Sequence, residues 1–378
     1  MTEGGVLLVY RDRIVPHSEA HFLRRQYLGF RHLAPIWIGR RTDLGLPDLG
    51  AEPILLGRHG GFGAVDRLLF KQFGRIPREP DLAMLRPRLI HAHFGKGGAL
   101  ALPIARALKV PLVVTFHGGD ATKNNHYRRQ LIPTIFQRRC TALKQEATLI
   151  ICVAEHIRSA LISRGFPPAK LKVIYYGVEP ETGSYPPPPA TRPYLLFVGR
   201  FVEKKGIGYL LDAMRLLQNE GTTLDLVLVG EGPMSEVLSR KSEGLYSTRF
   251  MGRLPNEEVR RKMSGALALC VPSVSTRDGD SEGLPNVVIE GMAAAVPVIG
   301  SDQGGIGEAV EHERTGFLVP PANPQAIAAA ARRLLSDPTL RHRMGSAAQV
   351  AASEHFNAFT QSRALEDTLL AVSDSSGV

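Results

Sequence analysis

The sequence predicts an α/β protein with two parallel-sheet domains facing each other across a cleft. Short apolar runs bounded by turn residues alternate with amphipathic stretches, and this alternation occurs in both halves of the chain. Strand and helix in alternation are typical of parallel sheets covered by helices on both faces. The 378 residues are enough for two such domains, and domains of this kind bind ligands at the carboxyl ends of their strands.

The elements follow from these apolar runs. The expected strands are residues 5–10, 88–94, 111–117, 148–153, 172–177, 194–199, 224–230, 267–273 and 296–301. Helical patterns cover residues 97–109, 206–218, 324–336 and 358–372. Four consecutive prolines at 186–189 cannot join a sheet or a helix interior, so they indicate a stiff connector between the domains. The expected organisation is a first domain over 1–183, a linker over 184–190, a second domain over 191–357, and a C-terminal helix over 358–378 that can cross back to the first domain.

Composition excludes several classes of protein. Cys140, Cys152 and Cys270 have no paired spacing, which argues against a disulfide framework or a cysteine zinc site. The N-terminus lacks a basic n-region, and no apolar run approaches the ~20 residues that span a bilayer. We therefore expect a cytoplasmic protein.

The charge is distributed unevenly between the two halves. Residues 1–180 contain 27 Lys and Arg and 13 Asp and Glu, which gives +14, whereas residues 181–378 contain 19 and 23, which gives −4. Basic and apolar residues are interleaved at 62–78 and 128–144, a pattern typical of binding to anionic lipid surfaces. For any single helix the better explanation is that its apolar face covers the sheet and its cations are solvated. For the whole domain we expect an anionic membrane surface as partner, and no nucleic acid, because no aromatic-basic binding module is present.

Phosphate-binding motifs are the next observation. The first strand is followed by residues 11–16 without glycine, so neither a dinucleotide fingerprint nor a P-loop is present. In the second half, Gly199 ends a strand, Arg200 and Lys205 follow, and Gly206 precedes a helix. Glycines allow close backbone approach and the cations neutralise charge, so a pyrophosphate would suit this loop. Taken alone, a basic surface loop explains it equally well.

The segment SEGLPNVVIEG at 281–291 favours the pyrophosphate. A helix that starts at Pro285 directs free amides out of its N-terminus. The amides concerned are those of Asn286, Val287 and Val288. Glu290, just over a turn into the helix, can accept from the two ribose hydroxyls, and Glu282 in the loop can bind hydroxyls of the group attached to the phosphate. The alternative is an unrelated helix start with two solvated glutamates.

Four motifs together resemble the retaining GT-B glycosyltransferases of family GT4. They are G-R-x(4)-K-G from Gly199, V-G-E-G-P at 229–233, E-G-L-P-N-V-V-I-E-G-M-A at 282–293 and G-G-I-G-E at 304–308. IHAHFGKGG and VVTFHGGD resemble the N-terminal domain of the family more loosely. The segments 15–19 and 277–283 resemble the bacterial exopolysaccharide branch of the colanic-acid type. Many relatives carry a Gly-Gly loop after the first strand, where this chain has residues 16–19, Pro-His-Ser-Glu.

The resemblance implies a role for each matching residue. Arg200 and Lys205 would hold the leaving diphosphate, Glu290 the ribose, and His117 would face the reacting sugar carbon. The implied catalytic residues are His117, Arg200, Lys205 and Glu282. The implied donor-binding residues are Gly199, Arg253, Leu254, Gly283, Leu284, Pro285, Asn286, Val287 and Glu290, and those on the acceptor side are Ser18, Glu19, Gly118 and Asp120. We interpret His91 and His93 as structural residues.

Asp278 and Asp280 form a D-x-D that could suggest a metal site. Because Arg200 and Lys205 supply positive charge for the diphosphate, we expect no metal and no cofactor, and interpret the two aspartates as loop residues, on the acceptor side if they touch a ligand. The family's retention of configuration implies front-face attack, in which the departing phosphate oxygen takes the acceptor proton.

The expected function is transfer of a hexose from a UDP- or GDP-sugar to a lipid-linked or oligosaccharide acceptor, in bacterial polysaccharide or glycolipid synthesis. A lipid-linked acceptor would explain the basic first half, with the enzyme peripheral on the inner face of the plasma membrane. The alternatives are a GT-B sugar-nucleotide epimerase, a phosphorylase, and a non-catalytic nucleotide-sugar-binding component of a polysaccharide complex.

Overall fold

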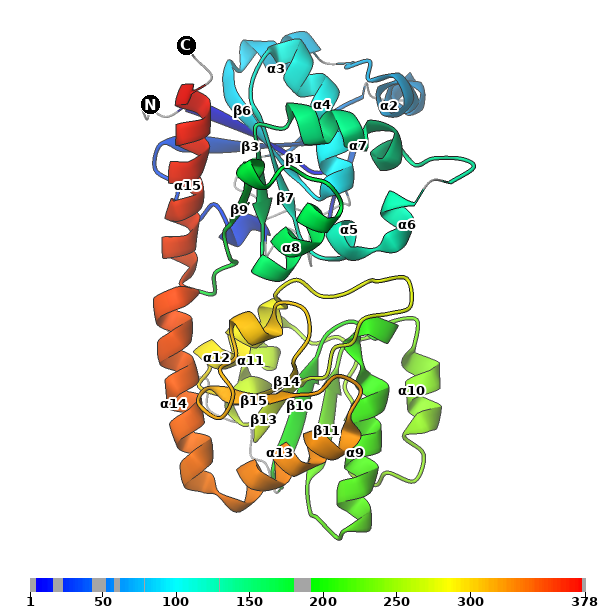
Figure 1. Ribbon diagram of the computed structural model, residues 1–378, viewed down its shortest axis with the longest axis vertical. Coiled ribbons are helices and arrows are strands. Elements are labelled where there is room, and N and C mark those ends of the chain that lie inside the picture. Colours follow the sequence, from blue (N-terminus) through cyan, green and yellow to red (C-terminus); the bar gives the residue numbers. More distant parts are fainter. Residues whose placement is uncertain are drawn as a thin grey trace. The chain divides into compact units, whose positions relative to one another are not determined.

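The computed structural model describes residues 5–15, 23–42, 52–57, 62–77, 79–128, 130–179 and 192–375. These residues form two compact units, each with its own parallel sheet (Figure 1). The first unit combines Met1–Gly177 with Ala358–Val378, and the second is Val178–Asn357. The α/β class with two parallel-sheet domains is therefore confirmed, whereas the linker expected at 184–190 lies outside the described residues.

Over the described part of the chain, the first unit has a seven-stranded parallel sheet in the order β5-β3-β1-β6-β7-β8-β9. Its strands are β1 Gly5–Tyr10, β3 Leu33–Gly39, β5 Ile54–Leu55, β6 Pro87–His93, β7 Leu112–Phe116, β8 Leu149–Cys152 and β9 Leu171–Val173. A separate parallel pair joins β2 Arg13–Ile14 to β4 Arg41–Thr42. Every residue of β7 is buried, as expected for a central strand with helices on both faces.

The helices of the first unit lie between its strands. They are α2 Phe62–Phe73, α3 Glu79–Met84, α4 Gly95–Leu108, α5 Gly119–Thr122, α6 Asn124–Tyr127, α7 Ile135–Glu146 and α8 Glu155–Ser163. The start of α7 is fixed by a capping box, in which the Thr134 side chain accepts from the Gln137 amide and the Gln137 side chain accepts from the Thr134 amide.

The second unit contains, in the residues described, a six-stranded parallel sheet in the order β12-β11-β10-β13-β14-β15. Its strands are β10 Tyr194–Val198, β11 Asp225–Val229, β12 Thr248–Phe250, β13 Ala268–Val271, β14 Val298–Ser301 and β15 Gly316–Val319. Its helices are α9 Ile207–Asn219, α10 Ser235–Lys241, α11 Asn256–Ser264, α12 Asn286–Ala293, α13 Pro324–Ser336 and α14 Pro338–His355. Helix α13 begins where Asn323 accepts from the Ala326 amide and Pro324 occupies the first turn.

The last helix, α15 (Ala358–Ser375), belongs to the first unit although it follows the second in sequence. Its Glu366 carboxylate accepts from three backbone amides, those of Arg31, His32 and Leu33, at 2.7–2.9 Å. Ser362 accepts from the Gly29 amide at 2.8 Å. Leu365 and Leu369 are buried in the core of the first unit, so α15 completes that core.

The structure corrects several element boundaries. The strand expected at 172–177 is β9, which ends at Val173. Strands β3 and β15 were not predicted, and β3 includes Pro35, a residue that normally argues against a central strand. Helices α9 and α4 begin within two residues of the expected positions, and α13 covers the expected range 324–336.

Candidate active site

In the second unit, residues of the candidate site follow the carboxyl ends of neighbouring strands. Gly199 follows β10, and its amide donates to the Val229 carbonyl of β11 at 3.0 Å. The Arg200 side chain that comes next is exposed. The exposed Arg253, after β12, lies 3.5 Å from the Glu231 carboxylate, and the neighbouring Leu254 is half-buried. Because the strands are parallel, these loops meet at one end of the sheet.

Four charged side chains at this end form a compact cluster. Lys205 Nζ lies 3.2 Å from Glu282 Oε1, and Lys204 Nζ lies 3.5 Å from the same oxygen. Lys204 also contacts Asp280 Oδ1 at 3.2 Å. All four side chains are largely buried, with exposed fractions between 12% and 21%. Two cations and two carboxylates thus balance one another, and we call Lys204, Lys205, Asp280 and Glu282 the charged cluster.

Burial and pairing act in opposite directions on the charged cluster. Burial raises the pKa of the Glu282 carboxyl, but Lys205 and Lys204 outweigh burial, so the pKa lies below its ordinary value. Burial lowers the pKa of Lys204, yet Glu282 and Asp280 raise it above its ordinary value. Both groups are therefore charged at neutral pH.

Backbone geometry holds the two lysines in place. Gly206, directly after them, has φ 65°, and a Cβ there would lie 1.8 Å from the Pro272 carbonyl oxygen. Only glycine fits such a close approach with a left-handed backbone. The Val274 amide donates to the Lys204 carbonyl at 2.8 Å, so the lysine turn is tied to the loop after β13.

The segment 282–290 also folds largely as its sequence indicates. Helix α12 begins at Asn286, directly after Pro285. The prediction of three free amides is corrected at Val288, whose amide donates to the Pro285 carbonyl at 2.9 Å. Gly283 and Leu284 are buried, and Glu290 is half-buried in the second turn of α12.

The glycine motif at 304–308 supports this loop. The Gly305 amide donates to the Gly283 carbonyl at 2.8 Å. Gly304 has φ 62°, and a Cβ there would lie 2.5 Å from the Glu282 carbonyl oxygen. The two motifs therefore form one unit, in which the second motif holds the backbone that carries Glu282.

Asp278 and Asp280 lie in a tight turn. The Thr276 hydroxyl donates to Asp278 Oδ1 at 2.5 Å, and the Asp280 amide donates to the same carboxylate oxygen at 3.2 Å. Asp280 in turn contacts Lys204. Asp278 therefore takes part in the turn, and Asp280 in both the turn and the charged cluster. No group of three or more His, Cys, Asp or Glu that could hold a metal occurs among the residues described.

In the first unit, His117 follows β7 and both of its ring nitrogens have partners. Nε2 lies 3.2 Å from His93 Nδ1, and Nδ1 contacts the Tyr176 hydroxyl. The Tyr176 ring stacks on the imidazole with centroids 5.8 Å apart, and the Phe94 ring lies 4.1 Å away. The imidazole is therefore fixed by contacts within its own unit.

Asp120 organises the backbone around His117. One carboxylate oxygen accepts from the amides of His117 and Gly118, at 3.0 and 2.8 Å, and the other accepts from the Gly95 amide at 3.0 Å. Burial raises the pKa of this carboxyl although the amides of Gly118, Gly95 and His117 act against burial. The structure thus gives Asp120 a backbone-supporting position, while Ser18 and Glu19 lie outside the described residues.

His91 and His93 point to the same side of β6 and are completely buried. The Tyr27 hydroxyl lies between them, 2.7 Å from His91 Nδ1 and 2.7 Å from His93 Nε2. His91 Nε2 contacts the Thr115 hydroxyl at 2.7 Å. Their burial and complete bonding agree with a structural interpretation, but the bonds also connect them to His117.

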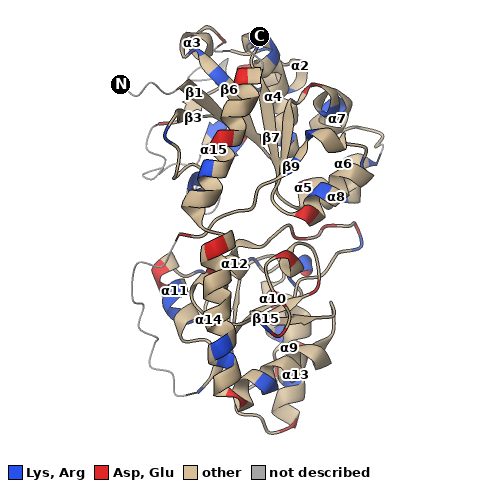
Figure 2. Ribbon diagram, turned by 60° about the vertical axis from the view of Figure 1, so that its left-hand side comes forward, with Lys and Arg blue, Asp and Glu red and all other residues tan. Residues whose placement is uncertain are grey.

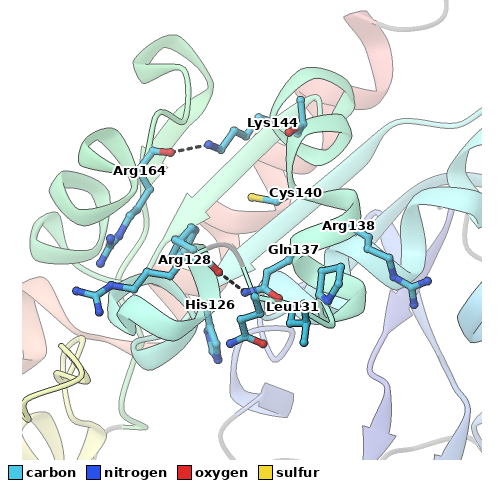
Figure 3. Close-up of a pocket in the computed structure, with 12 residues that line it drawn as sticks. His126, Arg128, Leu131, Gln137, Arg138, Cys140, Lys144 and Arg164 are labelled. Atoms are coloured by element: carbon cyan, nitrogen blue, oxygen red, sulfur yellow. Dashed lines mark hydrogen bonds between the residues drawn. The ribbon is translucent and has the colours of Figure 1, made fainter.

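The basic residues of the first unit surround an open pocket of about 590 Å³ (Figure 3). Four cations line it, and among the described residues that line it there is no carboxylate. The cations are Arg128, Arg138, Lys144 and Arg164. Lys144 donates to the Arg164 carbonyl at 2.5 Å. Figure 2 shows basic residues along α7, which forms one wall of the pocket. Leu131 lines the same pocket, and Ile132 is the next residue in the chain. The two residues are 101% and 83% exposed.

The comparisons with known proteins agree with this geometry. Residues 185–351 match the family described as glycosyl transferases group 1, and residues 47–182 match glycosyltransferase family 4. An uncharacterized glycosyltransferase of Methanocaldococcus jannaschii is 30% identical over 270 residues, which cover 68% of each chain. The chain belongs to this glycosyltransferase family. The expectation drawn from the motifs is confirmed.

Other glycosyltransferases are also similar. The amylovoran biosynthesis glycosyltransferase AmsK of Erwinia amylovora is 32% identical over 252 residues, or 64% of this chain. The match spans about 60% of the length of that relative. The Anabaena protein HepE in complex with UDP superposes with a TM-score of 0.76 at 19% identity, over 97% of this chain and 100% of its own. This likeness shows the GT-B fold.

Sequence reasoning missed three residues that the structure brings to these sites. The motif G-R-x(4)-K-G assigns a role to Lys205 only, although Lys204 stands directly before it and also belongs to the charged cluster. Tyr176 was assigned to a strand, and Tyr27 was not considered. A tyrosine carries no motif of its own, so only the fold could connect it to a histidine distant in sequence.

The helices were also compared with the requirements of a membrane span. Within the described part of the chain, none combines the length and the apolar character that crossing a bilayer requires.

Proposed function

We propose that this chain is a retaining, metal-independent hexosyltransferase that uses a nucleotide-sugar donor. The observation that carries the proposal is the contact between Lys205 and Glu282 beside the N-terminus of α12. In this proposal Lys205 would bind the diphosphate and the adjacent Glu282 the sugar, and both residues lie within the segment that matches the family.

The proposed chemistry needs charge stabilisation more than a protein nucleophile. Lys205 and the exposed Arg200 would hold the diphosphate, and its departure breaks the bond between the anomeric carbon and the phosphate oxygen. The acceptor oxygen attacks from the same face, and its proton passes to the departing phosphate oxygen. Glu282 would accept from sugar hydroxyls, and Glu290 from the ribose. In this proposal Arg200 and Lys205 supply the charge that a metal would otherwise provide, while Lys204 remains paired with Asp280 and Glu282.

A UDP-sugar is the first donor to test, because the structurally similar HepE was solved with UDP and with UDP-glucose; GDP-sugars are the second. A role in exopolysaccharide synthesis is supported by the names of the relatives, which include amylovoran and colanic acid glycosyltransferases. The acceptor in this proposal is lipid-linked or an oligosaccharide.

We also propose that the enzyme is cytoplasmic and associates peripherally with an anionic membrane. The basic pocket supports this, because its lining, as far as the chain is described, holds four cations and no carboxylate and lies beside the exposed Leu131 and Ile132. Figure 3 shows the guanidinium groups of Arg128 and Arg164 extending to the same side. Cations with adjacent exposed aliphatic side chains are what binding at a lipid interface requires.

The test is thermal unfolding with UDP, GDP and ADP, each with and without EDTA, on the wild type and Glu290→Ala. A ligand that binds only the folded protein raises the midpoint according to its occupancy. We expect one nucleoside diphosphate to raise the midpoint, with no effect of EDTA and no shift in the variant. If none of the three shifts the wild type, the donor site is wrongly assigned. A shift that EDTA abolishes would contradict metal independence alone.

A further inference from the structure

Six side chains of the first unit form one continuous hydrogen-bonded series, which we call the histidine relay. Its heavy-atom distances are 2.7 Å at three links and 3.2 Å between the two histidines His93 and His117. In order, the members are Thr115, His91, Tyr27, His93, His117 and Tyr176. The relay therefore connects a buried strand residue to His117, the imidazole that by resemblance to the family would face the sugar.

Tyr27 is the link that limits the whole series. Its hydroxyl lies 2.7 Å from a ring nitrogen of His91 and 2.7 Å from one of His93. A hydroxyl carries one proton, so it can donate to only one of the two histidines. If it accepted from both, its own buried proton would have no acceptor among the described residues, so it donates to one and accepts from the other. A neutral imidazole also has one donor nitrogen and one acceptor nitrogen. Each choice therefore fixes the next link.

When Tyr27 donates to His91, the other His91 nitrogen, Nε2, carries the proton and donates to Thr115. His93 must then donate from Nε2 to Tyr27 and accept at Nδ1 from the Nε2–H of His117. All three histidines are protonated at Nε2 in this arrangement.

When Tyr27 donates to His93 instead, every bond reverses. His93 donates from Nδ1 to His117, His117 donates from Nδ1 to Tyr176, and His91 donates from Nδ1 to Tyr27. All three histidines are then protonated at Nδ1. A mixed set would bring two donors or two lone pairs face to face at one of the links, or would leave the buried Tyr27 proton without an acceptor among the described residues.

The surroundings keep the relay neutral. Burial lowers the pKa of His91 to about 3. Burial also lowers the pKa of His93 and of His117 well below the ordinary value, and the nearby Arg11 guanidinium lowers both further. The remaining charged group at this end of the relay, Asp120, is occupied by backbone amides.

We propose that Tyr27, His91 and His93 are positioning residues for His117, and that the single hydroxyl proton of Tyr27 makes the three histidines share one tautomer. His117 then has a fixed ring position and a single tautomer, with its ring proton directed to His93 or to Tyr176. The part of this inference that concerns transfer rests on the proposed function, whereas the shared tautomer does not.

The first test is nitrogen NMR of the ¹⁵N-histidine-labelled full chain at pH 7, without ligand. Ring nitrogen shifts report which nitrogen carries the proton. We expect three neutral histidines, all protonated at Nε2 or all at Nδ1. A mixed set, or a protonated imidazolium among them, would overturn the relay.

The second test is Tyr27→Phe, with Tyr10→Phe as the matched control. Tyr10 is a fully buried tyrosine of the same unit, and its hydroxyl is not part of the relay. In Tyr27→Phe the histidines uncouple. We expect His91 to carry its proton at Nε2, toward Thr115, while His93 and His117 carry theirs at Nδ1, because a buried N–H without a partner costs more than a buried lone pair. A tautomer set that remains shared in this variant would contradict the proposal. Should the variant not fold, the wild-type spectrum decides alone.

Kinetics then separate this inference from the proposed function. With the donor identified by thermal unfolding, kcat of Tyr27→Phe should fall about tenfold with little change in KM, because the imidazole loses its fixed position. Tyr10→Phe should stay within about twofold of the wild type. An unchanged kcat in Tyr27→Phe would remove the positioning role. Absence of transfer with every donor in the wild type would count against the proposed function and leave the tautomer result standing.

Discussion

The carboxyl ends of the two sheets use opposite kinds of polar group. In the first unit the histidine relay is buried and neutral, and the direction of its hydrogen bonds depends on the position of the Tyr27 hydroxyl proton. In the second unit the charged cluster is largely buried too, but Lys204 and Lys205 are paired with two carboxylates. The same parallel-sheet architecture thus supports precise orientation in one unit and strong electrostatics in the other.

The difference teaches how each unit avoids the cost of burying polar groups. The relay meets that cost by staying uncharged, since burial lowers the pKa of each histidine. The charged cluster meets it by pairing, since Lys205 and Lys204 outweigh the effect of burial on the Glu282 carboxyl. The free energy of unfolding should therefore depend on pH differently in the two units.

Mild acid should destabilise the first unit well before the second. Below about pH 6.5 an unfolded chain binds a proton at each of His91, His93 and His117, whereas the folded unit does not. The free energy of unfolding should fall by up to about 1.4 kcal/mol per pH unit for each histidine. The pKa of Glu282 is lowered, so stability from the charged cluster is lost only as the pH falls below about 4.3, the ordinary value for a glutamate, toward the folded-state value. The pKa of Asp120 is raised above its ordinary value of 3.8, so above that value Asp120 adds stability as the pH falls and offsets part of the loss from the three histidines.

Hydrogen exchange at pH 7, 6 and 5, corrected for intrinsic rates, would measure the two units separately. His91→Gln should make the pH dependence of the first unit shallower by about one third, because one of three titrating groups is removed. The exposed His342 of the second unit provides the control, since His342→Gln should change nothing. Equal acid sensitivity of the two units would contradict the comparison.

Lys205→Ala should remove most of the transferase activity, because Lys205 is the member of the charged cluster assigned to the diphosphate. Loss of one preorganised cation at the leaving diphosphate should lower kcat about 10²- to 10³-fold. Lys241→Ala is the control, because Lys241 forms an exposed pair with Asp212 at 2.7 Å in the same unit and exposed pairs contribute little. Steady-state kinetics of both variants test this, and a Lys205→Ala enzyme within threefold of the wild type would refute the assigned role.

Glu366→Ala should lower the free energy of unfolding of the first unit and leave that of the second unchanged. It removes the acceptor of three backbone amides from a side chain that is only 2% exposed. The free energy of unfolding of the first unit should fall by about 2–3 kcal/mol. Asp367→Ala changes an exposed carboxylate one residue away and should have no measurable effect. Urea unfolding, monitored by hydrogen exchange, shows which of the two units is destabilised.

The smallest expected effect concerns the basic pocket. Replacing Leu131 and Ile132 by serine should weaken binding to vesicles that contain anionic lipid by about tenfold, because the apolar contribution at the interface is lost. Tyr246→Ser is the control, since Tyr246 is 92% exposed but lies in the second unit. Vesicle co-sedimentation measures both. Equal weakening by both replacements would place the membrane contact elsewhere.

The sequence predicted the second unit better than the first because the second unit's site is local. The residues of the charged cluster come from two short segments, 204–205 and 280–282, and each is directly followed by a glycine, Gly206 or Gly283. The helix start at Asn286 was readable from Pro285. Only the mutual contacts of Lys205 and Glu282 needed the fold.

In the first unit the important contacts join residues far apart in sequence. Tyr27 is 64 residues from His91, and Gly29 is 333 residues from Ser362. No periodicity or motif connects such positions, because hydrogen bonds of this range arise from the topology of the sheet. Strand β3 was missed for a related reason: Pro35 reads as a strand breaker, although β3 pairs on both sides.

The position of α15 has a consequence for biosynthesis. A ribosome makes residues 1–177 first, but the Glu366 carboxylate that satisfies the amides of Arg31, His32 and Leu33 emerges only after the whole second unit. The second unit is continuous in sequence and can fold as soon as it has left the exit tunnel. The half made first must therefore wait for the half made second, and a chain that stops before α15 would expose part of its first core to chaperones and proteases.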